Sequence, residues 1–124
     1  MFTINEDNSI YVTRGDVMFF TVTAEDNGEP YQFQPGDVLR ITVYGRKEAD
    51  NVVMQKDFEV DERATGVVMT FEEKDTKIGD VISKATDYWY EITLNPETAP
   101  QTIIGFDEEG AKIFRLYPEG ERVG

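Results

Sequence analysis

Cysteine and histidine are both absent from the sequence. Without a cysteine there is no disulfide and no thiol nucleophile, and without a histidine there is no Ser-His-Asp triad. Their joint absence also excludes the cysteine and histidine ligand sets of the usual zinc sites. A phosphate-binding loop ending in Gly-Lys-Ser or Gly-Lys-Thr is missing as well. We therefore predict that the chain is not an enzyme, and we assign it no catalytic, cofactor-binding or metal-binding residue and no cofactor.

Basic residues are scarce and long apolar runs are absent. Twelve Lys and Arg residues oppose 25 Asp and Glu residues, which gives a net charge of −13. Such a field repels phosphate backbones and anionic lipids, so we expect neither nucleic acid nor a membrane as a partner. No apolar run approaches the roughly 18 residues of a membrane span. Residues 1–7 lack the basic and apolar regions of a signal peptide, so we expect none.

The residues that are abundant favour a β fold. The 124 residues are 40% hydrophobic and include eight phenylalanines, six tyrosines and one tryptophan, enough apolar material for one core. Short segments with a period of two alternate with turn residues along the chain. We predict an all-β fold, a single antiparallel β-sandwich of about eight short strands, Ig-like or jelly-roll-like. Residues 1–117 form this domain, and 118–124 form a flexible C-terminal tail.

Two segments, 38–44 and 85–94, carry the clearest alternation of apolar and polar residues. We place six of their side chains in one core: Leu39, Ile41, Val43, Tyr90, Ile92 and Leu94. Further strands are expected at 9–13, 17–23, 31–33, 52–60, 67–71, 102–106 and 112–117. The last two are predicted to form a hairpin around the acidic turn 107–110, and Asn27-Gly28 to form a turn with two positive φ angles. The segment 72–84 is limited to a short helical turn because Gly79 disfavours a longer helix.

Two polar motifs, and the abundance of acidic residues, each have a structural interpretation and a functional one. Arg14-Gly15-Asp16 is the tripeptide that integrins bind, but its position before an apolar strand favours a turn. The acidic turn 107–110 lacks the alternating ligands of an EF-hand, so a solvated turn is favoured over a cation site. Glycosidases need two carboxylates about 5 to 9.5 Å apart, and with 25 acidic residues such a pair arises by chance.

The segment Tyr88-Trp89-Tyr90 is the one aromatic cluster that can stack on a sugar or dock a partner. A period of two places both tyrosines on one face of a strand and Trp89 on the other. The interpretation that we favour puts the tyrosine face in the core. Trp89 is then either packed or at an interface, and its exposure would favour the interface.

Several motifs taken together resemble a known family. They are Arg14-Gly15-Asp16 before an apolar strand, Pro35-Gly36-Asp37 before the next, Asp75-Thr76, and the late strand 88–94. This order resembles the N-terminal domain of baseplate upper proteins and of related small tail-associated proteins, from phages and prophages of Gram-positive bacteria. The resemblance covers roughly residues 9–116 and rests on short turn-and-strand motifs.

The resemblance implies a phage or prophage structural protein of the tail or baseplate type, which acts by protein–protein assembly. Its partners would be other virion or tail proteins, and an oligomer is compatible with this role. It would be found in the host cytoplasm before assembly and in the virion afterwards. The alternative function is a small carbohydrate- or ligand-binding β-sandwich module that uses Trp89 and neighbouring tyrosines.

Overall fold

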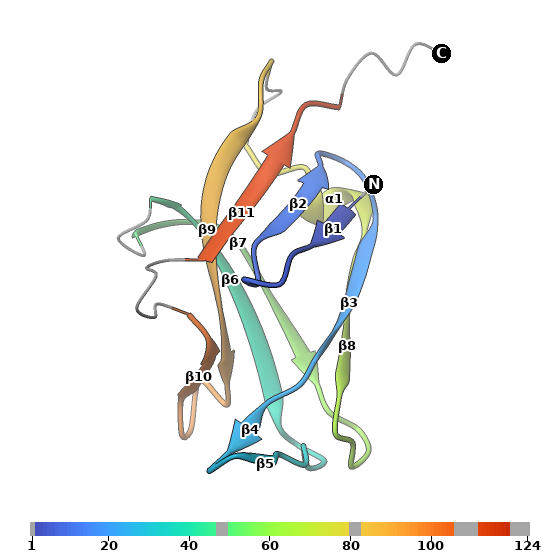
Figure 1. Ribbon diagram of the computed structural model, residues 1–124, viewed down its shortest axis with the longest axis vertical. Coiled ribbons are helices and arrows are strands. Elements are labelled where there is room, and N and C mark those ends of the chain that lie inside the picture. Colours follow the sequence, from blue (N-terminus) through green and yellow to red (C-terminus); the bar gives the residue numbers. More distant parts are fainter. Residues whose placement is uncertain (1, 47–49, 80–82, 106–111, 120–124) are drawn as a thin grey trace.

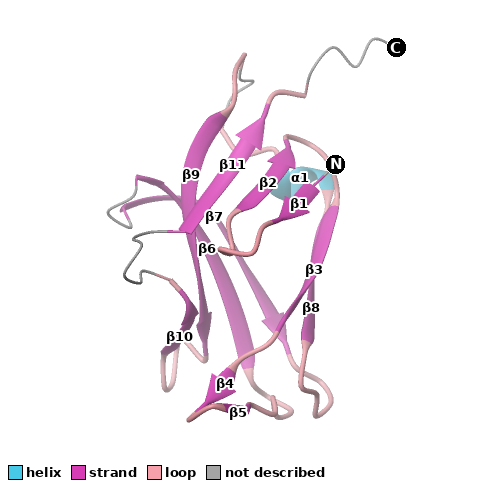
Figure 2. Cartoon of the chain, viewed as in Figure 1, coloured by secondary structure: helices cyan, strands magenta, loops and turns pink. Residues whose placement is uncertain are grey.

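A computed structural model describes residues 2–46, 50–79, 83–105 and 112–119. Of these residues 58% are in strands and 4% in a helix, so the predicted all-β class is confirmed. In Figure 2 strands, in magenta, make up most of the described chain, and helix is cyan. The described part contains eleven strands, more than the eight or so expected; a strand at Phe2–Ile4 and two strands of two residues each were not predicted.

Seven strands form the main sheet: β1 (Phe2–Ile4), β2 (Ile10–Thr13), β6 (Val38–Arg46), β7 (Asp50–Glu59), β9 (Thr86–Leu94), β10 (Gln101–Ile104) and β11 (Lys112–Tyr117). Their order is β1-β2-β11-β9-β6-β7, with β10 also paired to β9. A second sheet consists of β3 (Met18–Val22) and β8 (Val67–Phe71), and a small hairpin of β4 (Glu25–Asp26) and β5 (Glu29–Pro30). The only helix among the described residues is α1 (Glu73–Thr76), the short helical turn expected before Gly79.

The core lies between the main sheet and the β3–β8 pair, which runs along one side of the molecule (Figure 1). Alternate residues of β3 and β8 face this core, and Met18, Val22 and Met69 are at most 2% exposed. All six residues that the sequence places in the core, in β6 and β9, are buried to 5% exposure or less. The predicted register of both strands is therefore confirmed.

The arrangement of the strands differs from a purely antiparallel sandwich. Among the described strands, β2 and β11 pair in parallel, so the main sheet is mixed. The predicted hairpin of 102–106 with 112–117 is wrong, because β10 and β11 both pair with β9. The strands β10 and β11 lie end to end along one edge of β9, which has nine residues. Lys112 of β11 lies opposite Tyr90, and Ile104 of β10 lies opposite Ile92. The acidic turn 107–110 lies outside the described residues.

The turn at Asn27-Gly28 forms as predicted and closes the β4–β5 hairpin. Its two central residues have φ angles of 52° and 81°, as a tight two-residue hairpin turn requires. The strand expected at 31–33 is reduced to an isolated bridge between Phe33 and Ala64. Pro30 ends β5 and has no amide hydrogen, and after it the Tyr31 amide makes one more hydrogen bond across the hairpin, to the carbonyl of Ala24 at 2.9 Å.

Arg14, the first residue of the Arg-Gly-Asp turn, is buried. Its side chain donates hydrogen bonds to the backbone carbonyls of Ile78, at 3.3 Å, and of Gly79, at 2.8 Å, and it also pairs with Glu119. Arg14 is only 8% exposed. The turn therefore presents no accessible arginine of the kind that integrin binding requires, and the structural reading of the motif holds. Glu119 belongs to the segment predicted to be a tail, of which 120–124 lie outside the described residues.

The φ angle of the glycine in this turn explains its residue type, and a hydrogen bond to α1 holds it in place. Gly15 has a φ of +86°, in the left-handed region that favours glycine. Its amide donates to the hydroxyl of Thr76 at 3.0 Å, and that hydroxyl donates to the carbonyl of Asp16 at 2.7 Å. Thr76 is fully buried. The turn before β3 and the helix after β8 therefore form one hydrogen-bonded unit.

Candidate functional site

The aromatic cluster of β9 has the orientation that the sequence predicts. Tyr90 lies on the core face and is 4% exposed, while Trp89 lies on the opposite face and is half-buried. The Tyr90 hydroxyl donates a hydrogen bond to the backbone carbonyl of Asn8. Burial, with a smaller contribution from the negative charge of Asp7, raises the pKa of Tyr90 above its ordinary value. Tyr90 is therefore a structural residue that anchors the loop before β2.

Trp89 belongs to a row of apolar side chains on the outer face of the main sheet. Tyr44 of β6 lies opposite both Val52 of β7 and Trp89 of β9, and Ile113 of β11 lies opposite Trp89. These four residues, the Trp89 row, cross four neighbouring strands, which corresponds to about 14 Å at the usual strand spacing. The Tyr44 hydroxyl donates to Glu91 at 2.5 Å. Burial and this hydrogen bond raise the pKa of Tyr44 to about 12, so its hydroxyl stays protonated at neutral pH.

A second apolar surface lies on the outer face of β3 and β8. It consists of Val17, Phe19 and Val68, which are 61%, 61% and 54% exposed, and we call it the β3–β8 patch. Phe19 lies opposite Thr70, two residues from Val68, so Phe19 and Val68 are diagonal neighbours about 7 to 8 Å apart. The ring of Phe2 meets that of Phe19 edge-on, with 5.5 Å between the centroids.

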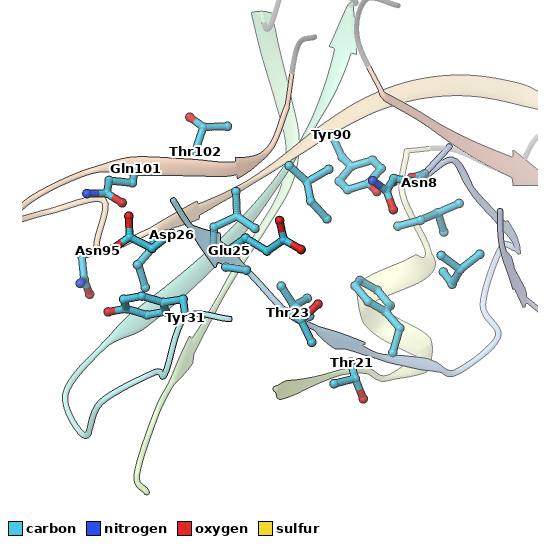
Figure 3. A pocket seen from close by; sticks show the side chains of 18 of the residues that line it. Asn8, Thr21, Thr23, Glu25, Asp26, Tyr31, Tyr90, Asn95, Gln101 and Thr102 are labelled. Atoms are coloured by element: carbon cyan, nitrogen blue, oxygen red, sulfur yellow. The ribbon is translucent and has the colours of Figure 1, made fainter. Parts of the chain in front are cut away.

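A cleft of about 820 Å³ opens between β3–β4 on one side and β10 on the other (Figure 3). Its apolar lining includes Ile10, Val22 and Leu94, which belong to the core. Its polar lining consists of Asn8, Thr21, Thr23, Glu25, Asp26, Tyr31, Tyr90, Asn95, Gln101 and Thr102. Among the described residues, the lining contains two carboxylates and no lysine or arginine. Such a cleft attracts cationic and hydrogen-bonding groups.

Asp37 positions two residues of this cleft. Its carboxylate accepts hydrogen bonds from the Gln34 amide at 2.8 Å, the Tyr31 hydroxyl at 3.1 Å and the Asn95 side-chain amide at 3.1 Å. Asn95 in turn accepts a hydrogen bond from the Val38 amide at 2.9 Å. The Pro-Gly-Asp turn thus fixes Tyr31 and Asn95 at one end of the cleft, the kind of turn chemistry expected of an aspartate in this position.

Among the described residues, two carboxylates are the charged groups that line the cleft. Glu25 and Asp26 are exposed, so water solvates both carboxylates. In the described part of the chain no three acidic side chains come together in a way that could hold a metal ion. Within the same residues, no helix is long and apolar enough to cross a membrane. Carboxylates in the lining of a cleft can neutralise a cationic group of a ligand.

The sequence interpretation identified Trp89 but missed the patch and the cleft. The patch had a readable signal, because Val17 and Phe19 alternate with Met18 and Phe20 and make both faces of the strand apolar. The cleft had none, since its walls depend on which strands leave an edge unpaired.

A scan against models of protein families finds no match for this chain. Searches of curated proteins and of solved structures find no significant match either. The likeness to baseplate upper proteins therefore rests on the short motifs of the sequence.

Proposed function

We propose that this chain is a non-catalytic structural module of a phage or prophage virion, of the tail or baseplate type, which binds another virion protein through the β3–β8 patch. The carrying observation is an outer strand face with Phe19 and Val68 more than half exposed, in a chain of net charge −13. Contiguous apolar surface amid charge is typical of an interaction site. The order of the turn-and-strand motifs supports the virion assignment.

The size of the patch fits a contact that works in many copies. Burying one large apolar side chain yields about 1.5 to 3 kcal/mol, and part of that gain is lost to the cost of association. Three such residues give a weak single contact. In an assembly that repeats the same contact, multivalency raises the overall affinity by orders of magnitude. The isolated protein can therefore be monomeric and still have this function.

The test is affinity capture from a lysate of phage-producing cells, with the bound proteins identified by mass spectrometry. The wild-type protein should capture tail or baseplate proteins, and the double variant Phe19→Ser/Val68→Thr should lose about tenfold or more of that capture. The matched control is Val52→Thr, since Val52 is 55% exposed on β7 and lies outside the patch. Equal capture by the double variant would contradict the proposal.

The second candidate is a carbohydrate- or ligand-binding module that uses the Trp89 row. The observation in its favour is the alignment of Tyr44, Trp89 and Ile113 across three strands, since aromatic side chains on an open sheet face can stack on sugar rings. A glycan array separates the two functions. Binding of a defined glycan that Trp89→Ala abolishes and Phe19→Ser preserves would establish the binding module in place of the assembly module.

A further inference from the structure

The two walls of the cleft are strand edges. Seven consecutive residues, 20–26, line it from β3 to β4, and all four residues of β10 line it from the other side. Successive side chains of a strand point to opposite faces, so a cavity lined by every residue of a run borders the edge of the strand. The cleft therefore runs along β3 and β10.

Both of these edges are unpaired in the part of the chain that the structure describes. β3 pairs with β8 alone, and β10 pairs with β9 alone. Each strand thus directs every second amide and carbonyl toward the cleft. An open edge of this kind is a template to which an extended chain adds as a further strand.

The dimensions and the chemistry of the cleft suit a short strand. The four residues of the open strand β10 extend for about 13 Å, and 820 Å³ lies within the range of ligand-binding clefts. The side chains on one face of an added strand would meet the apolar residues Ile10, Val22 and Leu94. Those on its other face would point to solvent.

The charge of the cleft indicates the character of its occupant. Glu25 and Asp26 stand at the β4 end of the lining (Figure 3), and none of the described residues that line it is basic. Glu29 lies opposite Asp26 in the same hairpin and adds to the negative field. A second copy of this chain, with a net charge of −13, would be repelled.

We propose that this cleft binds an extended, positively charged segment of a partner polypeptide by strand addition to β3 or β10. Its lysine or arginine side chains meet Glu25 and Asp26, and its backbone pairs with the open edge. The site is separate from the β3–β8 patch, which lies on the outer face of β3, and the proposal does not depend on the virion assignment.

A dye-labelled octapeptide of alternating lysine and valine is the ligand used in the test, with binding followed by fluorescence anisotropy. It should bind the wild-type protein saturably, and hydrogen–deuterium exchange should show protection of β3 and β10. The octapeptide of alternating glutamate and valine should not bind. The lysine–valine peptide with N-methylated backbone amides should also fail to bind, because N-methylation removes the donors that strand addition needs.

Charge reversal in the cleft is compared with charge reversal outside it. Glu25→Lys/Asp26→Lys should weaken binding of the lysine–valine peptide about tenfold or more. The control Asp61→Lys/Glu62→Lys makes the same change in net charge at two adjacent exposed residues that do not line the cleft, and should weaken binding less than about threefold. Thermal unfolding of both variants verifies that they are folded.

Three results would overturn the proposal. They are the absence of saturable peptide binding, equal effects of the two double variants, and full binding of the N-methylated peptide. The Phe19→Ser/Val68→Thr variant should bind the octapeptide like the wild type. Loss of partner capture by that variant with retention of peptide binding would distinguish the patch from the cleft.

Discussion

Asp37 illustrates how a single side chain holds separate segments of this protein together. Burial alone would raise the pKa of its carboxyl group. The hydrogen bonds from Gln34, Asn95 and Tyr31 outweigh burial and lower the pKa below its ordinary value of 3.8. The unfolded chain therefore binds a proton at this group more strongly than the folded chain does. The ionised carboxylate stabilises the fold above about pH 4, and this contribution is lost as the pH falls through the folded-state pKa.

Replacing Asp37 with Asn should lower the free energy of unfolding at pH 7 by about 1 to 2 kcal/mol, because a charged acceptor with three donors becomes a neutral one. The deficit relative to the wild type should shrink between about pH 4 and pH 2.5. Urea unfolding across this pH range measures it. The control is Asp61→Asn, which changes an exposed carboxyl group in the loop before β8. A deficit that stays constant down to pH 2.5 would contradict the assigned role.

Ile41 tests the packing of the core at one position. It is fully buried in β6, next to Ile92 of β9. Ile41→Ala should lower the free energy of unfolding by about 2 to 5 kcal/mol, since it removes buried carbon atoms and leaves a cavity. Val68→Ala, in an exposed strand position, should cost less than about 1 kcal/mol. A loss below about 0.5 kcal/mol for Ile41→Ala would contradict the register of the sheet.

At the scale of strands, the sequence predicted elements better than their partners. Alternation in 38–44 and 85–94 marked β6 and β9 with the correct buried faces, because a half-buried strand imposes a period of two on its own residues. The Asn27-Gly28 turn was equally readable, since its φ angles restrict which residues fit. These features depend on local geometry, and local sequence is enough to predict them.

The pairing of distant strands was not predictable in the same way. The alternation in 112–117 is the same whether that strand joins a hairpin with 102–106 or lies between β2 and β9. The choice depends on contacts with residues about 100 positions earlier, such as Ile10 opposite Phe114. The cleft follows from this choice, because within the described part of the chain β10 keeps an unpaired edge only when β11 pairs elsewhere. Sequence patterns therefore indicated the core and left the candidate site undetected.

On the scale of the whole molecule, ion pairs offset part of the acidic excess. The guanidinium of Arg40 contacts Asp57 at 2.7 Å and Glu97 at 2.8 Å. Arg115 contacts Asp87 at 2.6 Å, and its guanidinium lies over the ring of Tyr11. Because acids outnumber bases by 13, the remaining carboxylates repel one another in the folded chain more than in the expanded one. We therefore expect repulsion between carboxylates to outweigh the attraction within the ion pairs of the folded protein.

Sodium chloride should therefore raise the thermal midpoint, because a Debye length of about 30 Å at 0.01 M falls to about 10 Å at 0.1 M and screens this repulsion. We expect a rise of about 2 to 5 °C from 0.01 to 0.5 M, measured by circular dichroism at pH 7. The variant Asp61→Lys/Glu62→Lys changes the net charge from −13 to −9 and should show a smaller rise. Calcium chloride at equal ionic strength should act like sodium chloride. A midpoint that falls or stays flat with sodium would mean that the attractive pairs dominate, and a further rise with calcium alone would reveal a metal site.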